Sequence, residues 1–155
     1  MLCLSLRQPW ASLLIHGLKR FETRGWKPSP RSLKIIKRDG LLIHASLSKK
    51  SAPLMGAPPF SSHLEELGKL PYGAILGRCR VGRIIRTEDW HKEFKPRPGS
   101  EWWEEWCFGD FAPGRWAWSI EEPEVFEVPI PWKGSLSLWN YANPIPKPIQ
   151  ELICR

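Results

Sequence analysis

Apolar residues occur in short runs along the chain, separated by proline, glycine and charged residues, a pattern that favours a mainly β protein. The run 3–7 predicts a first strand. Pro9 then suits the first turn of a helix, where its missing N–H would have no partner in any case. Gly17 is expected to end that helix, because glycine adopts the left-handed cap without steric cost. Apolar residues at helical spacing from Trp10 onward give this short helix one buried face.

The rest of the chain continues the alternation of short elements and breaks. Further strands are predicted over 40–46, 72–85, 115–120 and 125–130. Short helices are predicted over 62–68 and 100–108, with Ser62 and Ser100 as caps. Proline, serine and charge predict loops over 25–39, 47–60 and 87–99, the first being either plain loop or loop with a short edge strand. The tail 143–155 predicts extended proline-rich chain followed by a short helix.

Composition indicates a single globular domain over residues 1–155. Hydrophobic residues make up 42% of the sequence and charged residues 25%, which is enough apolar content for a packed core. Lysine and arginine number 23 against 16 acidic residues, giving a net charge of +7. This balance favours a polyanionic partner, and it also fits an ordinary basic surface. Many of the ten tryptophans are expected in the core, and a few could be stacking surfaces for unpaired bases. Composition alone does not separate the two groups.

The cysteines indicate neither disulfides nor a metal site. Cys3, Cys79, Cys107 and Cys154 are scattered, with no C-x-x-C pair and no histidine at metal-ligand spacing. No metal and no cofactor are therefore expected. The N-terminus lacks a secretion signal and no stretch approaches the length needed to span a membrane, so the expected location is cytoplasmic, or nuclear if the source is eukaryotic.

Polar residues flank both ends of the first predicted helix. Arg7 and Gln8 precede it, and Lys19, Glu22 and Arg24 follow the glycine that ends it. A carboxylate between two cations stays ionised. Such a set can hold a phosphate on the two cations while the carboxylate accepts an amino hydrogen from a base. The same residues also fit a surface ion-pair network of little energetic value.

The sequence resembles the ASCH domain family, which is related to the PUA-like superfamily. The family pattern G-x-K-x-x-E-x-R is present at 17–24, preceded by LSLRQPWASLLIHG at 4–17. Further similar segments lie at 40–46, 72–84, 108–123 and 128–139. The resemblance implies an α+β, mainly β fold: a PUA-like β-barrel of five to seven strands with a few short helices. It also implies binding of nucleic acid, RNA favoured over DNA, or of a nucleotide-like ligand, in a basic cleft beside the first helix.

Two alternative functions follow from the same resemblance. Some family members are small hydrolases, either ribonucleases or N4-acetylcytidine amidohydrolases, and Lys19 and Glu22 would then be catalytic. Glu22 stands where those amidohydrolases have threonine, and Thr23 is one residue away. Whether the chain is an enzyme stays open. The second alternative is a protein-interaction module in transcription or RNA metabolism, with protein partners unknown.

Residues on two of the later strands complete the predicted nucleic-acid surface. Arg78 and Arg80 share one face of the segment 72–85 and form either a wall for the phosphate backbone or a solvent face. His44 lies inside the strand 40–46, as a ligand or as a hydrogen-bonded core histidine. The full predicted set is Arg7, Gln8, Trp10, Lys19, Glu22, Arg24, His44, Arg78 and Arg80.

Overall fold

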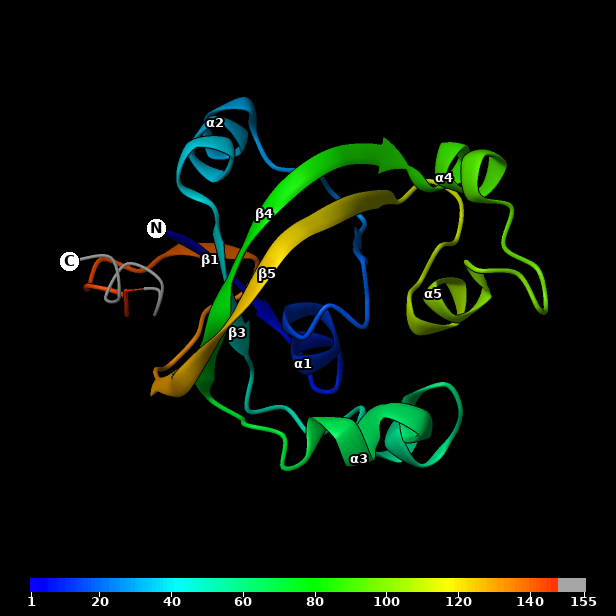
Figure 1. Cartoon of the computed structure of the whole chain (residues 1–155). Helices are drawn as coiled ribbons and strands as arrows, with labels where there is room; N and C mark the ends of the chain where they lie inside the picture. Colours follow the sequence, from blue (N-terminus) through cyan, green and yellow to red (C-terminus); the bar gives the residue numbers. More distant parts are fainter. Residues whose placement is uncertain (148–155) are drawn as a thin grey trace.

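One curled, six-stranded sheet forms the body of the protein in the computed structural model, which describes residues 1–147 (Figure 1). The strand order is β2-β5-β4-β3-β1-β6. The strands are β1 (Leu2–Leu6), β2 (Phe21–Arg24), β3 (Leu41–Ala45), β4 (Ala74–Arg86), β5 (Trp116–Pro131) and β6 (Leu138–Asn140). β1 and β3 are parallel, and the other neighbouring pairs are antiparallel. The predicted mainly β, α+β fold is confirmed, as a half-barrel.

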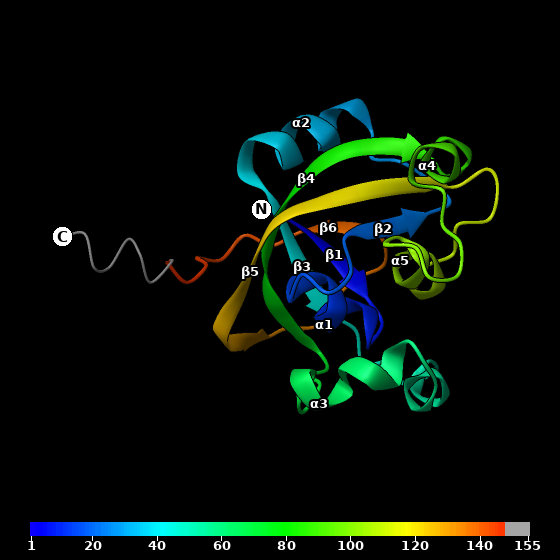
Figure 2. The same ribbon diagram turned by 45° about the vertical axis from the view of Figure 1, so that its right-hand side comes forward.

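Short helices cover the sheet and its ends. They are α1 (Trp10–Ile15), α2 (Pro30–Asp39), α3 (Leu64–Leu67), α4 (Thr87–Phe94) and α5 (Trp103–Phe108), with 3-10 turns at Ala52–Gly56 and Phe60–His63. α1 contacts β3, β4 and β5 and buries five of its six residues inside the curl of the sheet (Figure 2). The main core therefore lies between α1, α2 and the sheet, around Leu14, Ile36 and Trp118.

β4 and β5 form one long, bent antiparallel pair, and the segment that joins them carries α4 and α5. The separate strands predicted over 115–120 and 125–130 are wrong in that respect, because β5 runs continuously through Trp116–Pro131. Its pairing with β4 shifts register at three places, and these irregularities allow the strong curl. Gly77 is required at one of them, since a Cβ there would lie 2.1 Å from the Glu124 carbonyl oxygen and 2.6 Å from Ile15 Cγ1.

Two segments predicted as loops are helices instead. α2 occupies Pro30–Asp39 because Pro30 stands in the first turn, where proline is tolerated, and Ser29 caps the helix by accepting a hydrogen bond from the Ser32 amide at 3.1 Å. α4 occupies Thr87–Phe94, where charged side chains face solvent while Trp90 is fully buried. In both segments one apolar face is sufficient for a helix, despite the charge and proline that predict a loop.

Two predicted caps are also wrong. Ser62 lies within a 3-10 turn and gives no cap to α3, whose N-terminal flank is His63. Ser100 accepts a hydrogen bond from the Arg97 amide and does not cap α5, which begins after Trp102.

Cys3 and Cys79 are buried free thiols, and burial raises the pKa of each to about 12. Cys154 and the helix predicted near the C-terminus lie outside the described residues.

Within residues 1–147 the sheet does not close, and its two edge strands are β2 and β6. In this part of the chain, β2 pairs only with β5, and β6 pairs only with β1. Arg24 Nη2 donates a hydrogen bond to the Ser5 carbonyl at 3.0 Å, linking β2 to β1 across the opening, which we call the seam. None of the helices described is long and apolar enough to cross a membrane.

Candidate functional site

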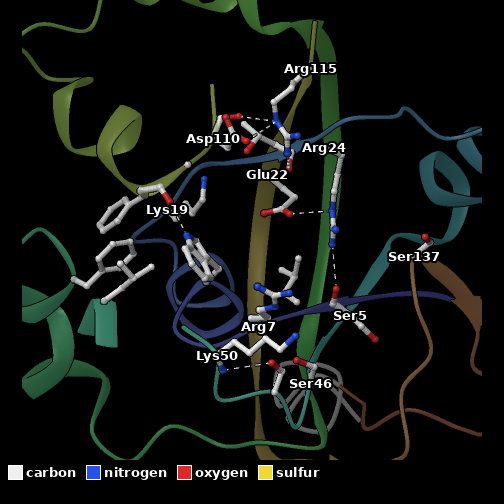
Figure 3. A pocket seen from close by; sticks show the side chains of 18 of the residues that line it. Ser5, Arg7, Lys19, Glu22, Arg24, Ser46, Lys50, Asp110, Arg115 and Ser137 are labelled. Carbon is white, nitrogen blue, oxygen red and sulfur yellow. Dashed lines mark hydrogen bonds and ion pairs between the residues drawn. The ribbon is translucent and has the colours of Figure 1, made fainter. Parts of the chain in front are cut away.

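A pocket of about 780 Å³ opens at the seam, and we call it the seam pocket (Figure 3). Its floor comes from the end of β1 and from β2, and its walls come from α1, α5 and the loop before β6. The volume is typical of small-molecule sites in proteins. The lining residues include five cations, namely Arg7, Lys19, Arg24, Lys50 and Arg115, against the two carboxyl groups of Glu22 and Asp110.

Lys19 is held in place by a carboxylate from α5. Only 1% of its side chain is exposed, and its Nζ lies 3.2 Å from Glu105 Oε1 while also donating to the Phe21 carbonyl. Glu105 accepts two further hydrogen bonds, from the backbone amides of Arg20 and Phe21, each at 2.8 Å. Lys19 therefore supplies a fixed positive charge at the pocket floor, and its ammonium hydrogens are largely committed to protein acceptors.

Glu22 is a buried carboxyl group with few partners. Its Oε1 lies 3.0 Å from Arg24 Nε, but the Nε hydrogen is not directed at an acceptor, so the contact is an ion pair without a proper hydrogen bond. Burial raises the pKa of Glu22, while the charges of Arg24, Lys19 and Arg115 oppose that shift. Figure 3 shows the carboxyl group pointing toward Arg24 within the pocket. Burial therefore opposes the fully ionised state that the sequence predicts for this carboxyl group.

Arg115 and Asp110 form the opposite side of the pocket. Arg115 Nε lies 3.4 Å from Asp110 Oδ2 and donates to the Asp110 carbonyl at 2.9 Å. Its Nη2 donates to the Thr23 carbonyl on β2 at 3.3 Å. These contacts tie the loop after α5 to the edge strand.

The mouth of the pocket carries cations and its wall carries aromatic rings. Arg7 and Lys50 are exposed, and no ion pair involving either side chain occurs within residues 1–147. Trp10 lines the wall with its Nε1 donating to the Phe108 carbonyl at 2.5 Å, and Phe60 packs edge-on to it with ring centroids 5.6 Å apart. The pocket thus offers exposed cations for an anion and an apolar surface for a planar group.

The predicted site residues separate into two groups. Arg7, Trp10, Lys19, Glu22 and Arg24 come together in the seam pocket.

Gln8 does not line the seam pocket. It is 1% exposed, and its amide donates to the Ser12 hydroxyl and the Pro71 carbonyl, both at 2.7 Å. Its side-chain oxygen accepts the Ser12 amide, so the residue braces the start of α1.

His44, Arg78 and Arg80 also lie apart from the seam pocket. His44 is hydrogen-bonded to the Ser5 hydroxyl at 3.1 Å and the Trp132 carbonyl at 2.9 Å, and burial lowers its pKa. Arg78 on β4 pairs with Glu124 on β5 at 2.7 Å, and Arg80 pairs with Glu122 on the same two strands at 3.2 Å. These three residues therefore fit the structural interpretation better than the ligand-binding one.

Several residues that line the pocket or support its lining carried no signal in the sequence. Glu105 lies 86 positions from Lys19, and Lys50 and Arg115 occur in segments where charge is common. The one usable hint was a glutamate on the apolar side of the predicted helix 100–108, since a carboxylate in that position needs a cation. Within the described part of the chain, no cluster of three or more histidine, cysteine or acidic side chains could hold a metal ion.

Comparison with known proteins agrees with the fold. The family model for the ASCH domain matches residues 4–129. The chain is 26% identical to Activating signal cointegrator 1 of Homo sapiens and 25% identical to that of Mus musculus, in both cases over 92% of this chain. It spans only 22% of the length of each of these relatives.

The solved ASCH protein from Zymomonas mobilis superposes with a TM-score of 0.55 at 12% identity, covering 91% of this chain and 87% of that one. A point variant of the same protein gives a TM-score of 0.53 at 14% identity. At this identity the likeness shows the fold alone. The match of the family model to most of the chain shows more: the chain belongs to the ASCH domain family.

Proposed function

We propose that the seam pocket binds a nucleotide of single-stranded nucleic acid, with RNA as the favoured partner. The observation that carries the proposal is the composition of the pocket: five basic side chains surround a 780 Å³ hollow that also has an aromatic wall. A nucleotide combines the two matching features, an anionic phosphate and a flat base. The ASCH family is associated with RNA binding, which supports the same partner.

The geometry gives each group a role in this proposal. Arg7 and Lys50 at the mouth contact the phosphate, because both are exposed and free of ion pairs within the described chain. Glu22 accepts an amino hydrogen of the base at the floor, next to the fixed charge of Lys19. Trp10 supplies the surface against which the base packs.

The salt dependence of RNA binding tests the proposal. Each phosphate contact contributes about 0.7 to the slope of log affinity against log salt for a single strand. Arg7→Ala is expected to weaken binding of a short RNA and to reduce that slope by about 0.7.

Arg80→Ala is the matched control, since Arg80 is an exposed arginine outside the pocket. It should leave the slope unchanged. Binding that is indifferent to salt, or equally sensitive to both substitutions, would contradict the proposal, and parallel DNA titrations measure the preference for RNA.

Glu22 supports a second candidate, a hydrolase acting on the bound nucleotide. A buried carboxyl group with a raised pKa, lining a cleft beside Arg24, is suited to general acid–base catalysis. Incubation with short RNA and with N4-acetylcytidine tests it, and activity should disappear in Glu22→Gln while binding persists. Absence of product from both substrates, with binding intact, removes this candidate.

A further inference from the structure

A second pocket, of about 740 Å³, lies between α4 and α5, and we call it the α4–α5 pocket. It shares three lining residues with the seam pocket: Cys107, Gly109 and Asp110. The short segment 107–110 is therefore a common wall between the two hollows. The two pockets therefore adjoin each other at this segment.

A rigid aromatic surface lines this pocket. Trp106 is 37% exposed, and its ring stacks on that of Trp103 with centroids 5.0 Å apart and planes inclined by 18°. Stacking on Trp103 fixes the orientation of the Trp106 ring before any ligand arrives. A pre-oriented, partly exposed indole is a suitable platform for a nucleic-acid base, because every base presents a π face.

A carboxylate with an unused oxygen stands in the same pocket. Glu88 Oε1 accepts a hydrogen bond from the Gly114 amide at 2.6 Å, whereas Oε2 has no partner among residues 1–147. Hydrogen bonds from the amides of Glu88 itself and of Gly114 lower the pKa of this carboxyl group, so it is ionised at neutral pH. A buried acceptor without a donor calls for one from outside, and the amino groups of cytosine, adenine and guanine are donors of the right kind.

Charges on the two sides of the common wall suit a passing phosphate. The Asp110 carboxylate at the wall is offset by Arg115 at 3.4 Å, on the seam-pocket side. Lys92 is exposed on the α4 side. The backbone of a strand crossing the wall would therefore run between two cations.

We propose that the α4–α5 pocket is a second base subsite, in which the base next to the one in the seam pocket stacks on Trp106 and donates an amino hydrogen to Glu88. The inference rests on the proposed function of the seam pocket. It makes the ligand a continuous single strand of at least two nucleotides. It favours a base with an exocyclic amino group at the second position over uracil, whose one donor, N3–H, lies between two carbonyl oxygens that a carboxylate repels.

Binding of ligands of different length tests the subsite. The probes are cytidine monophosphate, a cytidine tetranucleotide and a uridine tetranucleotide, titrated by calorimetry. Trp106→Ala is expected to weaken the cytidine tetranucleotide by about 5- to 150-fold, the range for loss of one base–aromatic stack, and to leave the mononucleotide within about twofold. Glu88→Gln should reduce the preference for the cytidine over the uridine tetranucleotide.

Two further variants keep the outcome clear. Trp132→Ala removes another exposed tryptophan, 41% accessible and outside both pockets, and should have no effect. Trp106→Phe should restore most of the affinity, which separates stacking from loss of fold.

If the mononucleotide binds but Trp106→Ala does not affect the tetranucleotide, the second subsite is overturned and the seam-pocket function survives. If neither ligand binds the wild-type protein, both proposals are overturned.

Discussion

Lys19 and Glu105 show how a buried charge can be tolerated beside a ligand pocket. Their side chains are 1% and 3% exposed, and Glu105 also accepts two backbone amides of the chain that enters β2. A buried pair of this kind adds little net stability over apolar residues of the same shape, but removing one partner leaves the other charge unpaired. The pair therefore fixes the position of β2 relative to α5.

Loss of the Glu105 carboxylate should destabilise the protein strongly. Glu105→Ala is expected to lower the free energy of unfolding by about 3–5 kcal/mol, since Lys19 and two amides lose their acceptor. Urea denaturation measures the change. The matched control is Glu101→Ala, because Glu101 is 72% exposed and pairs with Arg20 only at 3.6 Å, so its loss should change stability by less than about 0.5 kcal/mol. Equal effects of the two substitutions would contradict this role.

Glu22 should make stability depend on pH in a defined direction. Because burial raises its pKa in the folded state above its ordinary value of 4.5, the folded protein holds a proton that the unfolded chain releases first. The contribution of the protonated Glu22 carboxyl group to stability is therefore complete below pH 4.5. It is lost as the pH rises through the pKa that this group has in the folded state. Glu22→Gln should gain stability relative to wild type between pH 4 and pH 7, and a difference that is flat across this range would refute the assignment.

At the scale of elements, the antiparallel pair of β4 and β5 sets the shape of the sheet. Its three register shifts bend the strands around α1, and Gly77 allows the backbone of β5 and the side chain of Ile15 to come close. Sequence patterns identified the segment 72–85 as a strand. They did not show that β5 is continuous, because the acidic and proline residues near Pro123 resemble a turn.

Gly77→Ala tests the closeness of this packing. A methyl group there would collide with backbone on β5, which cannot move as a flexible side chain can, so the free energy of unfolding should fall by about 3 kcal/mol or more. Gly56→Ala is the control, since nothing lies within 4 Å of its added Cβ. The two variants are compared by thermal and urea unfolding. Similar stabilities would show that the β4–β5 pair tolerates the added methyl group.

At the scale of the whole molecule, the seam pocket is assembled from segments that lie far apart in the sequence. Its strand β1, helix α1 and the residues after Gly17 are local in sequence, and patterning predicted the strand and the helix close to where they lie. The residues that complete the pocket, Glu105 and Arg115, contact the segment of β2 from positions about ninety residues away in the sequence. They come close because the edge strand β2 pairs with β5. Periodicity reports which face of an element is buried, but it carries no information on which distant charge faces which.

Ligand binding should stabilise the edges of the sheet more than its centre. A nucleotide at 100 times its dissociation constant is expected to raise the free energy of unfolding by about 2.7 kcal/mol. Hydrogen exchange measured with and without cytidine monophosphate should slow most at the amides of β2 and of the loop before β6, which border the seam pocket. Uniform slowing across β3 and β4 would argue that the ligand binds elsewhere.

The unclosed sheet has a consequence for how this domain can change over evolution. The floor of the hollow is made of strands whose positions depend on the core, whereas its mouth is made of residues such as Lys50, Asp110 and Ser137 on connecting segments. Insertions or replacements in those connections leave the strand pairing intact. A protein built this way can exchange one guest for another by altering its border alone, so related chains with the same backbone need not share a substrate.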